Sequence, residues 1–266
     1  MNHGEMMKII LSRKGFDSQY GGQPSPILQD GTLLSLPIPS KRDQNKFSEI
    51  MHDGVSYYQI IKELKANTKI NEHYNCHLDP DIRNINGQIK TFGLFGQTGA
   101  ALGHLNKNGI GINDIFLFYG SFRETENING KLRYKQNSHE KHVIYGYLQI
   151  GQIFKDMNCL PNNIEHHPHS AYKDDLNYIY VSSNEFSLIE GKPGFGVLQY
   201  KPSLVLTKEN ESKSKWALPD FFRDVNITYH KQSSFKDSYF QSAAKGQEFI
   251  IDGSKEIINW VINLIH

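Results

Sequence analysis

The densest group of reactive side chains lies in residues 73–83, HYNCHLDPDIR. Imidazole, thiol and carboxylate groups transfer protons near neutral pH and bind metal ions. In an extended segment His77, Asp79 and Asp81 alternate onto one side, and we predict these three residues to be catalytic. A turn is the competing interpretation, because Asp-Pro-Asp is also ordinary turn chemistry. No paired Cys-x-x-Cys motif accompanies the segment, so the cofactor is left unknown and a divalent metal is left open.

A second histidine cluster lies in residues 165–172, EHHPHSAY. A proline between His167 and His169 stiffens the backbone that carries both imidazoles. We predict His169 to be catalytic and His167 to bind the ligand, and an ordinary surface loop is the competing interpretation. A joint site requires one of these histidines to lie beside Asp79 and Asp81.

Residues 97–105, QTGAALGHL, are predicted to form a short helix. Gln97 and His104 are seven residues apart, which would place them on one helical face. The alanines between them leave room for another group to approach. An amide and an imidazole can bind the hydrogen-bonding edge of a base or position a water molecule. We therefore predict Gln97 to bind ligand and His104 to be catalytic, with capping of a neighbouring element as the alternative.

The loop of residues 12–26, SRKGFDSQYGGQPSP, has more charges, glycines and prolines than a simple connection needs. Arg13 and the backbone amides around Gly21 and Gly22 are suited to an anion. The loop is neither a P-loop nor a GxGxxG motif. We predict that it forms one wall of a polar pocket for an anionic or nucleotide ligand.

Apolar runs predict more strands than helices. Strands are predicted for residues 8–12, 32–39, 114–119, 142–154, 178–182 and 203–207. Residues 55–66 and 255–265 are predicted helices, and Gly146 and Gly151 are expected to mark bulges. Strands and helices do not alternate regularly, so we predict an α+β fold with a mixed, mostly antiparallel sheet and peripheral helices, in a single domain over residues 8–266.

Composition limits the classes of partner. The chain has 266 residues, 38% of them hydrophobic, and a formal net charge of +1. A protein that follows long DNA through phosphate contacts is usually more basic. The two cysteines, Cys76 and Cys159, are too few for a disulfide framework, which favours a reducing, cytoplasmic compartment. No apolar run approaches the ~20 residues of a membrane helix, so no membrane partner is expected.

Several longer strings resemble the nucleotide modification associated domain 3 family over about residues 8–252. They are SRKGFDSQYGGQPSPIL, HLDPDI, FGQTGAALGHL, NDIFLFYGSFR, HVIYGYLQIG and GQEFI. The resemblance implies a role in DNA base modification or phage conflict, with a nucleotide or nucleic-acid base and proteins of a modification system as partners. The resemblance does not supply a mechanism, but the family's motifs would include the candidate site residues. From their side-chain chemistry we predict two groups: for the ligand, Arg13, Asp17, Tyr20, Gln97, His167 and Gln247, and for catalysis, His77, Asp79, Asp81, His104 and His169. Residues 244–252, AKGQEFIID, place Gln247 and Glu248 next to a strand. Glu248 is expected to be an exposed strand carboxylate, with a general acid or base as the alternative.

A weaker likeness covers about residues 92–200. The strings GINDIFLFYGSF and HVIYGYLQIGQIF are similar to strands of PUA-like barrels, including the ASCH and EVE groups. This likeness implies a β-barrel core that holds RNA or a modified base. The polar stretch 123–140 departs from that pattern.

Three functional hypotheses follow. The first is an enzyme that processes a nucleotide or a base, with the charged loop holding phosphate or sugar. The second is a non-catalytic, PUA-like module that recognises a modified base, which needs few phosphate contacts. The third is an assembly subunit whose polar clusters are structural. The enzyme is favoured because acid–base side chains gather in loops.

Overall fold

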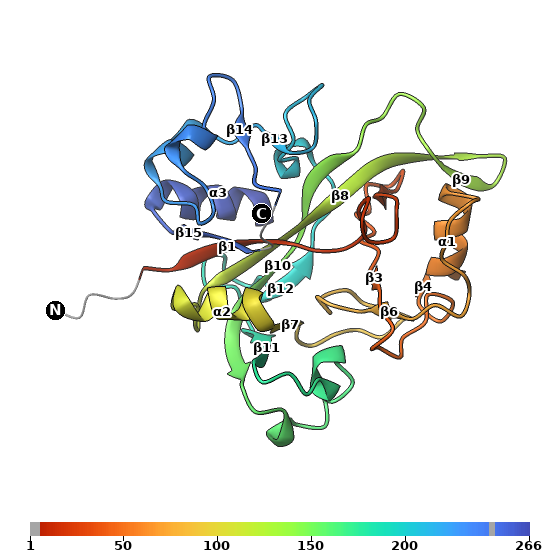
Figure 1. The fold of residues 1–266 in the computed structure, drawn as a ribbon, viewed down its shortest axis with the longest axis horizontal. Helices are drawn as coiled ribbons and strands as arrows, with labels where there is room; N and C mark the ends of the chain where they lie inside the picture. The colour runs from red at the N-terminus through yellow and green to blue at the C-terminus, as the bar shows by residue number, and fades with distance from the viewer. Residues whose placement is uncertain (1–5, 245–247) are drawn as a thin grey trace.

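The computed structural model describes residues 6–244 and 248–266. Its centre is an open sheet in the order β15-β1-β8-β10-β11-β7 (Figure 1). These strands are β15 (Glu248–Asp252), β1 (Lys8–Arg13), β8 (Ile115–Ile128), β10 (Lys141–Phe154), β11 (Asn177–Ser182) and β7 (Leu94–Thr98). Three further strands join it: β12 (Phe195–Val197) on β10, and β2 (Ser25–Ile27) and β9 (Lys131–Tyr134) on β8.

The pairing is mixed and mostly antiparallel, as predicted. β1 and β2 run parallel to β8, whereas the other pairs in the sheet are antiparallel. In the described residues the sheet does not close, because β15 and β7 lie at opposite ends of its strand order. The barrel alternative for the core is therefore wrong. The polar stretch 123–140 extends β8 and returns as β9, and this hairpin turns at Asn129 and Gly130, which both have positive φ.

Helices lie at the periphery. They are α1 (Tyr57–Leu64), α2 (Gly99–Lys107) and α3 (Lys255–Ile265). In Figure 1, α3 lies beside β15 at one side of the molecule and α1 lies beside β9 at the other. Short 3-10 helices are η1 (Met157–Cys159), η2 (Pro168–Ala171), η3 (Pro202–Leu204), η4 (Asp220–Asp224) and η5 (Gln232–Ser234). Three strand pairs stand apart from the sheet: β3 (Ile38–Pro39) with β6 (Cys76–His77), β4 (Met51–His52) with β5 (Val55–Ser56), and β13 (Lys215–Trp216) with β14 (Phe240–Gln241).

The core is strongly aromatic. Phe95 packs edge-on against Phe116 and Phe118, with ring centroids 4.7 and 5.2 Å apart, and stacks on Tyr180 at 5.9 Å. These rings come from β7, β8 and β11 and fix the middle of the sheet. A second cluster lies under the loop that follows β1, where Phe16 is fully buried. Any Cβ at Gly21 would lie 2.4 Å from the Phe16 ring, so this glycine serves the packing of the loop.

Two predicted strands are wrong. Of residues 32–39 only the last two form a strand, β3, whereas Thr32 and Leu33 make only isolated bridges, to Gln199 and Ile27. Residues 203–207 begin instead within η3, whose first turn accepts Pro202 without losing a hydrogen bond. The two predicted bulges are confirmed: the register of β10 shifts between Ile144 and Gly146 and again at Gly151.

Both cysteines are free, with Cys76 buried and Cys159 exposed. The absence of a disulfide between them therefore agrees with the expectation from composition. Among the helices in the described part of the chain, none is both long and apolar enough to cross a membrane.

Candidate functional site

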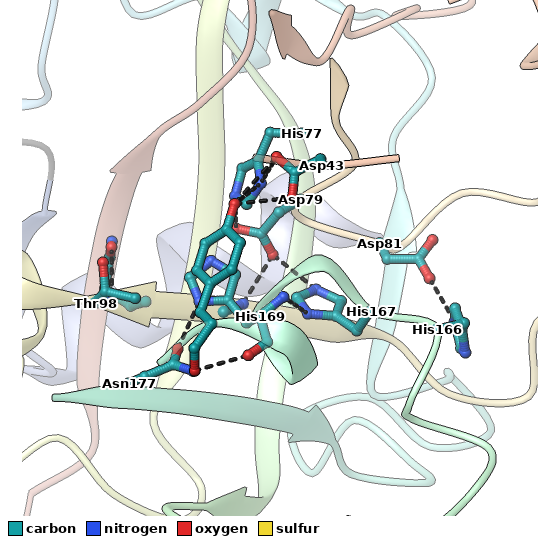
Figure 2. A network of polar contacts seen from close by, with 12 residues as sticks. Asp43, His77, Asp79, Asp81, Thr98, His166, His167, His169 and Asn177 are labelled. Atoms are coloured by element: carbon teal, nitrogen blue, oxygen red, sulfur yellow. Dashed lines mark hydrogen bonds and ion pairs between the residues drawn. The ribbon is translucent and has the colours of Figure 1, made fainter. Parts of the chain in front are cut away.

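A cleft of about 270 Å³ opens where five segments meet. Its walls come from the end of β1 and the loop after it, from β3, from β6 and the residues that follow it, from the end of β7, and from η2. The polar side chains that line it are Arg13, Lys14, Asp17, Tyr20, Ser40, His77, Asp79, Gln97, Thr98, His169 and Tyr172. Figure 2 shows His77, Asp79, His167 and His169 pointing toward one another.

Asp79 lies at the centre of the buried polar network, with its side chain 3% exposed. Its Oδ1 accepts a hydrogen bond from the Gly96 backbone N–H at 2.8 Å and lies 3.1 Å from His167 Nε2. Its Oδ2 lies 3.7 Å from His77 Nε2. Burial alone would raise the pKa of Asp79, but the contacts with His167 and His77 outweigh it and lower this pKa below its usual range. Asp79 is therefore an ionised carboxylate inside the protein.

His77 is held between two carboxylates. Its Nδ1 lies 3.0 Å from Asp43 Oδ2, and the Tyr172 hydroxyl donates to Asp43 Oδ1 at 2.8 Å. Burial would lower the pKa of His77, but the contacts with Asp43 and Asp79 outweigh it and raise the pKa to about 9. In this arrangement an imidazolium bridges the two carboxylates at neutral pH.

The local hydrogen bonds fix the tautomer of His167. Its Nδ1 accepts from the backbone N–H of His169 at 3.3 Å, at the first turn of η2. A neutral imidazole that accepts at Nδ1 carries its proton on Nε2, so Nε2 donates to Asp79. The side chain of His167 is 0% exposed and is not part of the cleft lining. It therefore contacts Asp79 from outside the cleft, although the sequence predicted it to bind the ligand.

His169 is oriented by Asn177 at the start of β11. The Asn177 amide donates to the His169 carbonyl at 2.8 Å, which directs its Oδ1 to His169 Nδ1, also at 2.8 Å. Nδ1 is thus the donor, and Nε2 keeps its lone pair. Burial lowers the pKa of His169 to about 4, so this imidazole is neutral. Its ring packs so closely on β7 that a Cβ at Gly96 would lie 2.2 Å from it.

A second buried contact joins the cleft to the C-terminal strand. Gln97 Nε2 donates to Glu248 Oε1 at 2.6 Å, and Lys14 Nζ lies 3.0 Å from the same oxygen. The side chains of Lys14 and Glu248 are 12% and 1% exposed. The expectation that Glu248 is an exposed strand carboxylate is therefore wrong, because β15 pairs with β1 and turns this residue inward beneath the cleft.

The two predicted histidine clusters meet. His77, Asp79 and His169 share the cleft, and His167 contacts Asp79 although the two are 88 residues apart in sequence. Asp81 is buried at the side of the network, where its Oδ2 contacts Lys90 Nζ at 2.6 Å and His166 Nε2 at 3.3 Å (Figure 2). It is not among the residues that line this cleft.

Of the other predicted site residues, some line the cleft and others lie away from it. Arg13, Asp17 and Tyr20 line the cleft, and Asp17 Oδ1 also accepts from the backbone N–H of Tyr20 at 2.8 Å. His104 lies elsewhere, 3.1 Å from Thr228 Oγ1. The prediction that Gln97 and His104 share one helical face is wrong, because Gln97 belongs to β7 and α2 begins only at Gly99. Gln247 lies outside the described residues.

Sequence reasoning missed the residues that orient the network. Asp43 follows Lys41 and Arg42 in SKRDQNK, a pattern typical of a solvated turn, yet its side chain is 2% exposed. Asn177 and Tyr172 carry no motif of their own. A glycine within an apolar run is the one pattern that could have indicated close approach here, and Gly96 has it.

Comparison with known proteins identifies a family for this chain. The family model described as nucleotide modification associated domain 3 matches residues 8–252, so the chain belongs to this family. No curated protein and no solved structure gives a significant match.

Proposed function

We propose that this member of the nucleotide modification associated domain 3 family is an enzyme that modifies a nucleotide, or a base of nucleic acid, held in the cleft. The observation that carries the proposal is the meeting of His77, Asp79 and His169 at one cleft, from segments far apart in the chain. Buried groups with opposed pKa shifts in a cleft are typical of functional sites. The family name supplies the substrate class.

The size and lining of the cleft favour a single nucleotide unit. A volume of about 270 Å³ is at the lower end of the range for small-molecule sites. Tyr20 is 47% exposed at the rim, where its ring is available to stack on a base. Thr98 offers a hydroxyl, and Arg13 is the guanidinium we assign to phosphate. His77, Asp79 and His169 have donor atoms within 4.8 Å of one another and supply the chemistry.

The test has a binding step and a product step. Melting temperatures of the purified chain are measured with ribo- and deoxyribonucleotides and with short single-stranded DNA and RNA, with and without divalent ions. A ligand that binds only the folded state raises the melting temperature by mass action. Nucleosides recovered after long incubation are then compared by mass spectrometry. We expect a nucleotide to stabilise the protein and to appear with a changed mass.

Two tyrosine variants, one at the cleft and one away from it, test whether the nucleotide binds in the cleft. Tyr20→Ala removes the exposed ring at the rim, and stacking on an aromatic ring contributes about 1–3 kcal/mol per base. We therefore expect binding to weaken by about 5- to 150-fold. Tyr74→Ala removes a ring of similar exposure, 40%, that does not line the cleft, and it should leave binding unchanged. Absence of any nucleotide effect, or equal effects of both variants, would contradict the proposal.

A non-catalytic module that recognises a modified base is the remaining candidate, because the same rim tyrosine suits a base held without reaction. It predicts oligonucleotide binding with no product. With a net charge of +1, its affinity should fall only gently with salt. Binding of this kind without any change of mass would replace the enzyme by the module.

A further inference from the structure

We propose that His77, Asp79 and His169 form a binding site for one divalent transition-metal ion, of the class that includes zinc and ferrous iron. One donor atom from each lies within 4.8 Å of the other two. Two imidazoles and one carboxylate are a donor set preferred by these ions. Three protein ligands leave further positions open, and here the open side is the cleft, since all three residues line it.

The strongest support is that a separate partner holds the far side of each ligand. Asp43 lies 3.0 Å from Nδ1 of His77, and Asn177 Oδ1 lies 2.8 Å from Nδ1 of His169. Such outer contacts fix the tautomer and orientation of metal-binding histidines. Both imidazoles therefore direct Nε2 into the shared space, and His77 releases its Nε2 proton when the ion binds.

Contacts outside the proposed metal site also orient Asp79. Its Oδ1 is occupied by the Gly96 N–H at 2.8 Å and by His167 Nε2 at 3.1 Å. Its Oδ2 is the oxygen nearest His77 Nε2, at 3.7 Å. Bonds of about 2.0–2.2 Å to zinc place neighbouring donors about 3.4 Å apart, so small side-chain rotations would complete the set.

Charge also favours a cation here. Arg13 and Lys14 bring two positive charges to the cleft, whereas Asp17 and Asp79 line it and Asp43 and Glu248 lie directly behind. In the described residues, the ion pairs of Asp43 and Asp79 are all with histidines. Buried carboxylates need compensation. A divalent ion replaces the single positive charge of protonated His77 with two and makes the cleft complementary to an anionic nucleotide.

The neighbouring acidic groups lack this arrangement. Asp81 is already paired with Lys90 at 2.6 Å, and Glu248 with Lys14 at 3.0 Å. Each therefore has a lysine where the proposed site has only histidines. The part that the ion plays in catalysis rests on the proposed function, whereas the existence of the site is measured without any nucleotide.

The experiment uses the untagged full chain, because an affinity tag of histidines would bind the same ions. The protein is stripped with a chelator and dialysed separately against Zn²⁺, Mn²⁺, Mg²⁺ and, without oxygen, Fe²⁺. Bound metal is counted by mass spectrometry after gel filtration. We expect about one ion per chain for a transition metal and little Mg²⁺, which prefers oxygen ligands. The preferred ion distinguishes zinc from iron.

Variants assign the ion to the site. His169→Gln and Asp79→Asn should each lower the affinity at least tenfold, and Asn177→Ala, which frees His169, should lower it 10–100-fold. His166→Ala is the matched control, because this neighbouring histidine is 56% exposed and outside the cleft. Circular dichroism verifies the fold of each variant. The inference is overturned if the wild type holds no more ion than His169→Gln and Asn177→Ala, or if His166→Ala loses the ion equally.

Discussion

A single buried histidine outside the cleft makes the stability of the protein sensitive to acid. His142 is 6% exposed and accepts a hydrogen bond at Nδ1 from the Trp216 indole at 3.1 Å. Burial, together with the charges of Lys213 and Arg13, lowers the pKa of His142 to about 3. The unfolded chain takes up a proton there near pH 6.5, whereas the folded chain does not. The stabilisation is thus present above pH 6.5 and is lost as the pH falls toward 3.

His142→Asn tests this linkage, since the asparagine oxygen can still accept from Trp216 but does not titrate. Between pH 8 and pH 5 the wild type should lose about 2 kcal/mol of unfolding free energy that the variant does not lose. Urea unfolding at several pH values, followed by circular dichroism, gives both curves. Parallel curves for the two proteins would show that His142 is already protonated in the folded state.

At the scale of single residues, the sequence identifies the reactive side chains of the cleft better than it identifies the residues that hold them in place. His77 and Asp79 stand out because they alternate in a short polar segment, and both line the cleft. Asp43 and Asn177 are recognisable only from what they touch, since an aspartate among lysines and an asparagine before a strand are ordinary surface patterns. The reason is physical: the partners of a buried polar group are chosen by tertiary contacts, which leave no spacing in the sequence.

At the scale of elements, two glycines in adjacent segments should respond oppositely to the same substitution. Gly96 lies in β7, where a Cβ would lie 2.2 Å from the His169 ring. Gly96→Ala should cost about 1–3 kcal/mol by overpacking and displace His169. Gly103 lies inside α2, and its Cβ would meet only Leu176 at 3.9 Å. Gly103→Ala should stabilise by about 0.5–1 kcal/mol.

Chemical denaturation of both variants measures the two changes. The nucleotide-induced melting shift should fall in Gly96→Ala and persist in Gly103→Ala, because only the first moves a side chain of the cleft. Equal stability of Gly96→Ala and the wild type would mean that the His169 ring can move away from the added methyl group without cost. The prediction that this ring is fixed by its packing on β7 would then be wrong.

Element prediction succeeded where one signal dominated. The period of α3 and the apolar runs of β1 and β10 identify these elements, and the glycines of β10 mark its bulges. It failed at Gln97, where the helix-like pattern begins two residues before α2. Gly99 has a φ of 55°, so the chain turns there from strand to helix. A local pattern does not reveal such a change, because it depends on pairing of β7 with β11.

At the scale of the whole molecule, the cleft requires both ends of the chain. β1 brings the loop with Lys14, and β15 brings Glu248, which Gln97 contacts across 151 residues of sequence. The α+β class follows from counting strands, but this assembly does not. Parallel pairing of β1 with β8 and antiparallel pairing of β1 with β15 are long-range choices, set by which apolar faces meet.

The last helix tests whether the structural unit extends past the family match, which ends at residue 252. α3 buries Ile257, Val261, Leu264 and Ile265 against the main core. Burying each such side chain contributes about 1.5–3 kcal/mol, so together they rival the ~5–15 kcal/mol stability of a typical protein. Removing residues 254–266 should therefore abolish cooperative unfolding. Leu264→Ala should cost about 2–5 kcal/mol, whereas Asn259→Ala, on the exposed face, should cost nothing. Urea unfolding distinguishes these cases, and an unchanged midpoint in the truncated chain would make α3 an appendage.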